Sequence, residues 1–320
     1  MIQLTEETEI DPRLKKLSYS SQVTLHKCPK KYQLYKCGAE SEDTSSVTFA
    51  FGHAVGEGIQ SLTLGLSLEE TVWRMFLAWD YDLLGEEDKA KKSFWYAVYA
   101  IIKFQDIGPQ LLRGYEVALI PSTATGKLVP ATELSFVINL PSGFTYIGYV
   151  DLVLRHKETG KLLVLEVKST KFREVSEASY KNSAQAIGYS VVLDAIESAH
   201  GANDYRVMYL VYKSSVMEFE PLIFPKTFTQ RALWIQQIML DCDMITHYAT
   251  IDLFPLHGES CFDFFRPCEY LDICTLDSKY LISAPINNTL VPKKEVEYTI
   301  NITLADLINS QLAKHIIGEH

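Results

Sequence analysis

The sequence predicts an α/β fold with a central mixed β-sheet flanked by helices. Residues 133–169 and 205–224 carry the β-branched, aromatic and alternating patterns that are typical of strands. Four other segments have apolar residues at helical spacing: residues 67–84, 87–107, 176–198 and 226–250. Strand and helix patterns that follow one another along a chain favour a sheet covered by helices.

Composition narrows the class of protein. At 320 residues the chain can form one large domain or two small ones, and its 47% apolar and 22% charged residues are ordinary for a globular protein. No apolar run approaches the ~20 residues of a membrane-spanning helix. The N-terminus also lacks the basic-then-apolar order of a signal peptide. We therefore expect an intracellular, cytoplasmic protein that does not bind membranes.

The net charge of −10 argues against a protein that binds nucleic acid by bulk electrostatics. Long-range attraction to phosphate needs positive potential, which this chain as a whole does not have. An enzyme with a local basic groove stays possible, because lysines and arginines cluster within residues 15–31 and 168–173.

Residues 146–171 predict a β-hairpin around which the rest of the chain is organised. Its turn, HKETGK, contains Gly160, and its second half, KLLVLEVKS, is the nearly unbroken apolar run expected of a strand buried on both faces. Three charges interrupt this apolar context: Asp151, Glu166 and Lys168. A buried charge is costly unless another group pairs with it.

The spacing of these charges predicts that they meet. Glu166 and Lys168 are two residues apart, so their side chains leave the same face of a strand, where Asp151 of the neighbouring strand can reach them. Two carboxylates and an ammonium suit a Mg²⁺ or Mn²⁺ site for phosphodiester hydrolysis, since hard cations prefer oxygen ligands and lower the pKa of bound water. The alternative is a buried salt-bridge cluster.

Other polar residues stand at positions where they share a face or begin an element. His53 opens a helical pattern, where a lone histidine is more often structural than a ligand, and Glu57 lies four residues later on the same face. Glu133 stands at the start of a strand pattern and is either a carboxylate at the rim of the site or a solvated residue. Gln185 and Tyr189 are also four apart and share one face of a predicted helix.

The chain has six cysteines, and three of them, Cys261, Cys268 and Cys274, crowd into fourteen residues. Disulfides are rare in intracellular proteins, so this crowding indicates a metal or cluster site. Cys242 falls within a predicted long helix, where we expect a buried thiol.

Six short motifs follow one another in the sequence: SYSSQVTLHKCPKKYQL, FGHAVGEGIQ, GYVDLVL, LEVKST, QAIGY and CFDFFRPCEYLDIC. In this order they resemble the PD-(D/E)XK nuclease superfamily, in its RecB-like branch of CRISPR-associated, AddB-type and phage exonucleases. The resemblance covers roughly residues 17–280. It implies a restriction-endonuclease-like core with a helical insertion at residues 57–115.

The resemblance also implies roles for individual residues. It assigns the divalent metal to four groups: His53, Asp151, Glu166 and the backbone carbonyl of Val167. Lys168 would be the catalytic lysine. Gln185 and Tyr189 would line the DNA groove and steady the site.

The same resemblance places four cysteines in one 4Fe–4S cluster: Cys28, Cys261, Cys268 and Cys274. The cluster would join the N-terminal segment to the C-terminal one. Relatives commonly show Cys-x2-Cys-x5-Cys near the C-terminus, whereas the spacing here is Cys261-x6-Cys268-x5-Cys274. A zinc site with the same thiolates is the nearest rival, and Cys37 or His26 could substitute in it.

Together these observations predict a Mg²⁺- or Mn²⁺-dependent DNA exonuclease that hydrolyses single strands or DNA ends in recombination or repair. The alternative is a DNA-end binding or adaptor protein on the same fold, or one that works only with recombination, repair or spacer-acquisition proteins. We expect residues 1–280 to form the nuclease domain. Residues 281–320, a strand and a short helix, would be an appendage for docking or oligomerisation, or would pack on the same domain.

Overall fold

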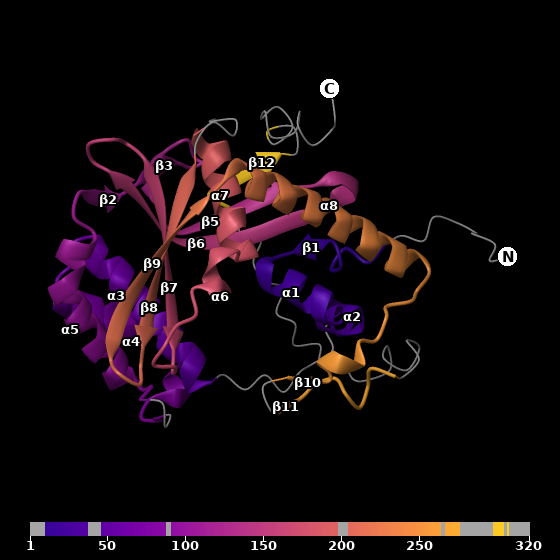
Figure 1. Cartoon of the computed structure of the whole chain (residues 1–320), viewed down its shortest axis with the longest axis horizontal. Helices are drawn as coiled ribbons and strands as arrows, with labels where there is room; N and C mark the ends of the chain where they lie inside the picture. The colour runs from indigo at the N-terminus through magenta and orange to yellow at the C-terminus, as the bar shows by residue number, and fades with distance from the viewer. Residues whose placement is uncertain are drawn as a thin grey trace.

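The structure, a computed structural model, describes residues 10–37, 46–87, 91–197, 204–263, 266–275, 297–303 and 306. Within these ranges an eight-stranded sheet runs through the molecule with helices on both of its faces (Figure 1). The predicted α/β fold, with a mixed sheet flanked by helices, is therefore confirmed.

The sheet has the order β12–β5–β6–β7–β8–β9, with β1 and β2 paired along β6. Its strands are β1 (Lys16–Leu17), β2 (Tyr115–Val117), β5 (Thr132–Asn139), β6 (Thr145–His156), β7 (Leu162–Thr170), β8 (Tyr205–Lys213), β9 (Glu218–Lys226) and β12 (Ile300–Thr303). The β5–β6–β7 meander is antiparallel, β7 and β8 are parallel, and β8 and β9 are again antiparallel. Two small hairpins form separate two-stranded sheets: β3 (Leu119–Pro121) with β4 (Leu128–Pro130), and β10 (Phe262–Asp263) with β11 (Arg266–Pro267).

Eight α-helices cover the described part of the sheet: α1 (Tyr19–Lys27), α2 (Pro29–Cys37), α3 (Val47–Thr63), α4 (Leu68–Ala78), α5 (Phe94–Leu111), α6 (Ala178–Lys181), α7 (Ala184–Glu197) and α8 (Phe228–Thr250). Apolar residues of α3, α4 and α5 pack on one face of the sheet, and those of α1, α7 and α8 pack on the other. The predicted helical insertion corresponds to the end of α3 together with α4 and α5. None of the described helices is both long and apolar enough to cross a membrane.

Helix α3 begins earlier than the sequence pattern predicts. Its N-cap is Ser46, and it runs from Val47, so His53 lies in the middle of the helix and does not open it. The preceding letters SVTFAF are β-branched and aromatic, which favours a strand locally. Burial of Phe51 and Ala54 against the sheet overrides this preference.

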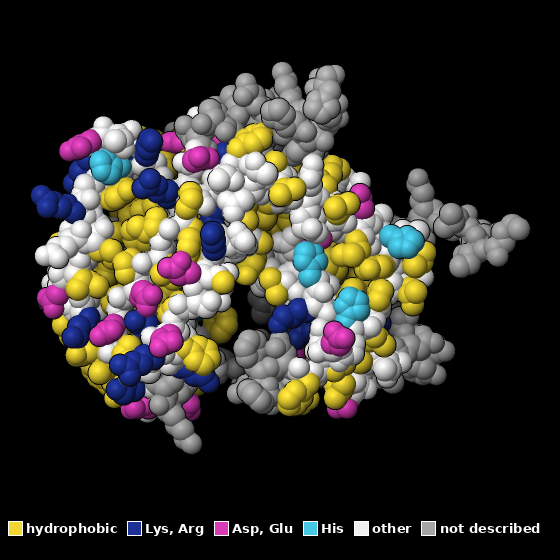
Figure 2. All heavy atoms as spheres, in the orientation of Figure 1, with side chains coloured by type: hydrophobic (Ala, Val, Ile, Leu, Met, Phe, Trp, Pro, Cys, Tyr) yellow, Lys and Arg dark blue, Asp and Glu magenta, His cyan; other side chains and the backbone are white. Residues whose placement is uncertain are grey.

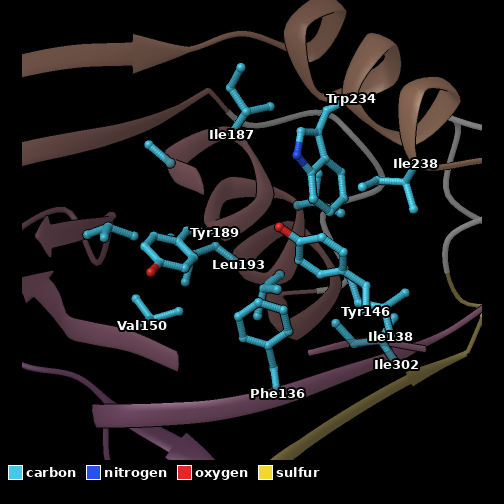
Figure 3. Packing of buried hydrophobic residues seen from close by; sticks show 14 of the residues in the cluster. Phe136, Ile138, Tyr146, Val150, Ile187, Tyr189, Leu193, Trp234, Ile238 and Ile302 are labelled. Carbon is cyan, nitrogen blue, oxygen red and sulfur yellow. The ribbon is translucent and has the colours of Figure 1, made fainter. Parts of the chain in front are cut away.

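Close packing holds α7 and α8 against the sheet (Figure 3). The ring of Tyr146 meets Trp234 of α8 edge-on at 5.0 Å, and Phe136 meets Tyr189 of α7 edge-on at 6.3 Å. Gly188 is required here, because a Cβ on it would lie 2.8 Å from the Trp234 ring. The short approach packs α7 directly against α8 and so helps to set the direction of the helix face that carries Gln185 and Tyr189.

The two ends of the described chain return to the same body. After α8 the chain reaches the junction of α1 and α2, where Ser260 Oγ donates to the carbonyl of Lys27 at 2.7 Å and Lys30 N donates to the carbonyl of Pro255 at 3.1 Å. Strand β12 pairs in parallel with β5 at the sheet edge. Most of the predicted 281–320 appendage, including nearly all of its predicted helix, lies outside the described residues, and the boundary at 280 stays a prediction.

Candidate active site

The carboxylates lie where the β6–β7 ladder ends. The two strands pair from Arg155 with Leu162 as far as Leu152 with Leu165. Asp151 and Glu166 occupy the next position on each strand. Asp151 Oδ2 accepts the backbone N–H of Val167 at 2.9 Å, so a side chain replaces the missing ladder partner. The end of the ladder therefore sets both carboxylates side by side and fixes the orientation of one of them.

A chain of polar contacts leads away from Glu166. Its Oε1 lies 2.6 Å from the Lys168 ammonium, which also donates to Gln185 Oε1 at 3.2 Å. Gln185 Nε2 in turn donates to the hydroxyl of Tyr189 at 2.7 Å. Glu166 itself is only 1% exposed. Three elements, β6, β7 and α7, thus hold one connected polar group.

A cavity of about 530 Å³ contains all of these groups. Every residue predicted for the catalytic and metal roles lines it: His53, Asp151, Glu166, Val167, Lys168, Gln185 and Tyr189. Other parts of its wall come from α1, α3 and β6. On the face shown in Figure 2 the surface is hollowed between the part that carries α4 and α5 and the part that carries α1 and α2. The structure brings together the residues that the sequence predicted, and their roles stay predictions.

Glu133 lines the same cavity and is itself exposed to solvent, so it lies at the rim, and a role in metal binding stays a prediction. Its backbone has φ of +46°, a left-handed value that is rare for a residue with a side chain. Consequently Ala131 and Leu134, three residues apart, both face the same core. Gln60 Nε2 donates to Glu133 Oε1 at 2.7 Å.

Sequence reasoning missed Gln60. It is 4% exposed on α3 and lies seven residues after His53, which places both side chains on the same face of the helix. That spacing is the signal that could have found it. The buried amide of Gln60 thus has a carboxylate partner, and this hydrogen bond ties α3 to β5 beside Asp151 and Glu166.

Burial dominates the electrostatics of the carboxylates. Burial, and then the charge of Glu166, raise the pKa of Asp151 to about 7. Burial likewise raises the pKa of Glu166, although Lys168 opposes the shift. For Lys168, burial disfavours the charged form, but attraction and hydrogen bonding to Glu166 outweigh it and raise its pKa. The carboxylates therefore bear a cost of ionisation that a bound cation would offset, while the lysine stays charged.

Within the described ranges, no three His, Cys, Asp or Glu side chains form a ready-made metal-binding group. At the carboxylates, the ammonium of Lys168 lies directly on Glu166 Oε1 and neutralises a charge that a cation would share. The second oxygen, Glu166 Oε2, is buried and has no hydrogen-bond partner among the described residues. An orphaned, buried carboxylate oxygen is the kind of donor that a divalent cation binds.

A second, smaller cavity is lined by the four predicted cysteines: Cys28, Cys261, Cys268 and Cys274. Cys28 is the C-cap of α1, and the backbone N–H of Cys268 donates to the carbonyl of Cys261 at 2.8 Å. The two proposed substitutes lie elsewhere. His26 Nε2 is 2.7 Å from Asp241 Oδ1, and the Cys37 thiol contacts Asp11. As predicted, Cys242 is a buried thiol of α8.

A family model for the PD-(D/E)XK nuclease superfamily matches residues 16–275 of the chain. None of the curated proteins matches this chain. Among solved structures, a putative exonuclease from Eubacterium rectale is similar, with 11% sequence identity, a TM-score of 0.46, and coverage of 89% of this chain and 100% of that chain. The family match spans well over half of the chain and includes every residue that lines the larger cavity. On this evidence the chain belongs to the PD-(D/E)XK nuclease superfamily.

Proposed function

We propose that this protein is a metal-dependent DNA exonuclease that hydrolyses phosphodiester bonds in single strands or at DNA ends. The observation that carries the proposal is the convergence of Asp151, Glu166 and Lys168 at the end of the β6–β7 ladder, in one cavity with His53. Nucleases of this superfamily typically use divalent metal ions such as Mg²⁺. The donor set here is of the same kind.

The residues present fit a divalent cation. His53, Asp151, Glu166 and the Val167 carbonyl would hold it, and the orphaned Glu166 Oε2 supports this assignment. When bound, Mg²⁺ or Mn²⁺ would supply Lewis-acid polarisation of the phosphate and a water of lowered pKa. The hydrogen bond from Val167 N to Asp151 Oδ2 already holds this carboxylate in a fixed orientation for such a role.

Lys168 would stabilise charge and would not act as a base. Its pKa is raised by Glu166, so it keeps its proton at neutral pH. An ammonium fixed by Glu166 and Gln185 can orient the attacking water and neutralise the charge that develops on the phosphate. Tyr189 anchors Gln185 and so holds the lysine in place. In this scheme Gln185 and Tyr189 are positioning residues.

The test is cleavage of end-labelled single-stranded and duplex DNA by purified protein with Mg²⁺, Mn²⁺ or EDTA. We expect Asp151→Ala and Lys168→Ala to abolish cleavage while circular dichroism and melting stay those of a folded protein. Lys171→Ala is the matched control, since Lys171 is exposed just after the same strand. Cleavage by both variants at the wild-type rate would overturn the assignment. Binding without cleavage by the wild-type protein would favour the DNA-end adaptor.

We further propose that the four clustered cysteines hold a metal centre, with a 4Fe–4S cluster as the first candidate. Four thiols from both ends of the described chain around one cavity form a donor set that suits such a cluster or a single zinc ion. Anaerobic purification with iron, sulfide and zinc analysis tests this. About four irons per chain support the cluster, one zinc per chain supports the rival, and no bound metal overturns both.

A further inference from the structure

Two aromatic side chains are exposed to solvent at the cavity that contains Asp151 and Glu166, which is called the carboxylate cavity below. Phe49 is 70% exposed and Tyr149 is 45% exposed, yet both line the cavity that holds Asp151 and Glu166. Single exposed aromatics are ordinary on a protein surface. Two from different elements that converge on one polar cavity require a reason.

Both rings lie beside predicted metal ligands. Phe49 is in the first turn of α3, one helical turn before His53, and the two ring centroids are 5.7 Å apart. Tyr149 is on β6, two residues before Asp151, and pairs across the sheet with the small Ser135. The cavity is therefore flanked by an aromatic ring on its α3 side and by another on its β6 side.

The wall of the same cavity also offers hydrogen-bonding groups. Ser18 and Ser20 from the start of α1 and Thr48 from α3 carry hydroxyls and line the same cavity. Hydroxyl groups are common partners of phosphate and sugar oxygens. An aromatic ring, in contrast, stacks on a base only when that base has left its own stack, as in a single strand.

The negative net charge of the chain explains why binding of DNA would need base stacking. The chain carries a net charge of −10, and charged groups of both signs are interspersed on the face shown in Figure 2. General attraction to phosphate is therefore weak. Stacking supplies affinity that depends little on the overall charge, and it acts on any base.

We propose that Phe49 and Tyr149 form a stacking clamp that makes single-stranded DNA, and not the intact duplex, the substrate bound next to the carboxylates. This inference rests on the proposed nuclease function, whose substrate it specifies. The bases on either side of the phosphate at the cavity would lie against the two rings.

The test measures binding separately from cleavage. Fluorescence anisotropy follows three labelled probes: a ten-residue oligothymidylate, a blunt duplex, and a ten-residue strand of abasic sites. Ca²⁺ replaces Mg²⁺, and gels verify that the probes stay intact. We expect the wild type to bind oligothymidylate more tightly than the other two probes.

Four variants test whether the rings of Phe49 and Tyr149 contribute to binding. Phe49→Ala and Tyr149→Ala should each weaken oligothymidylate binding by about 5- to 150-fold, the range of one lost base stack. Neither should alter binding to the abasic strand, where no base can stack. Tyr149→Phe, which keeps the ring, should bind like wild type. Trp95→Ala is the matched control, since Trp95 is 74% exposed but does not line the cavity.

Equal loss on oligothymidylate and abasic strand, or no loss with either alanine variant, overturns the clamp. Cleavage by the wild-type protein with Mg²⁺ or Mn²⁺ is scored independently. If base-dependent binding is found without cleavage, the nuclease proposal fails and the clamp stands. If cleavage is found without base-dependent binding, the clamp fails and the nuclease proposal stands.

Discussion

The carboxylate cavity takes its functional side chains from long regular elements. The cysteine cavity, lined by Cys28, Cys261, Cys268 and Cys274, takes its thiols from a helix end and short turns. Asp151 lies within a strand of twelve residues and Glu166 within one of nine. Cys261 and Cys268 flank a hairpin whose strands have two residues each. Sites on strands and helices are held more precisely than sites on loops. The first cavity is thus shaped by the packing of long elements, while the second is held by a few contacts between short segments, such as the hydrogen bond from Ser260 Oγ to the Lys27 carbonyl.

Removing divalent metal should give the largest effect, and it should act on activity at the carboxylate cavity rather than on stability. EDTA should reduce DNA cleavage by roughly 10³-fold or more, because the metal would supply most of the stabilisation of the transition state. The melting temperature should hardly change, since the β6–β7 strands and α7 keep their packing. Cleavage and thermal melting measured on the same dialysed sample test this. A large fall in melting temperature, with the iron and zinc content of the sample unchanged, would mean that the carboxylate cavity also depends on its metal for shape.

Removing one thiol should have the opposite effect. Cys28→Ser should lower the free energy of unfolding by an amount on the order of 2–5 kcal/mol, because a metal centre would close a very long loop between the ends of the described chain. Urea denaturation of metal-loaded protein measures it. Cys37→Ser is the control, since Cys37 lies outside the cysteine cavity. Similar unfolding curves for both variants would show that the thiols are not joined by a metal.

Substitution of Asp241 tests whether the hydrogen bonds between α1, which ends at Cys28, and α8 contribute to stability. It is 1% exposed on α8 and accepts hydrogen bonds from Gln22 and Gln237, with His26 Nε2 at 2.7 Å. Asp241→Ala should cost about 2 kcal/mol in unfolding free energy, because buried donors lose their acceptor. The exposed neighbour Asp243→Ala should cost far less. Equal effects of the two substitutions would mean that this link between α1 and α8 contributes nothing.

An effect of similar size and opposite sign concerns the free-energy cost of ionising the buried Asp151. The pKa of Asp151 is raised to about 7, above its unfolded value, so the ionised form destabilises the fold as pH rises from about 4 to 7. Asp151→Asn keeps an acceptor for Val167 N and removes that cost. In EDTA at pH 8 it should therefore stabilise the protein by on the order of 2 kcal/mol, and less at pH 5. Melting at both pH values checks the sign, and a destabilised variant at pH 8 would contradict it.

Local sequence patterns were enough to predict the β5–β6–β7 meander and the position of its charged residues. An apolar run broken by Glu166 and Lys168 already specifies a strand, a face and a need for partners, and β7 has that form. The role of Glu133 could not be predicted in this way. It depends on a left-handed backbone and on Gln60, which is 73 residues away in sequence. Likewise, the interval between Cys261 and Cys268 says nothing of the hairpin that brings them close.

The junction of α1 and α2 with the segment after α8 sets an order of events during synthesis. Cys28 leaves the ribosome roughly 230 residues before Cys261, which at about 5–20 residues per second is a delay of roughly 10–50 s. By then the residues up to Tyr189, which include every lining residue of the carboxylate cavity, have already been translated. The residues of the carboxylate cavity are thus translated before the segment after α8 and before β12. In the proposed metal centre, the thiol of Cys28 would therefore wait until late in synthesis for its three partner thiols.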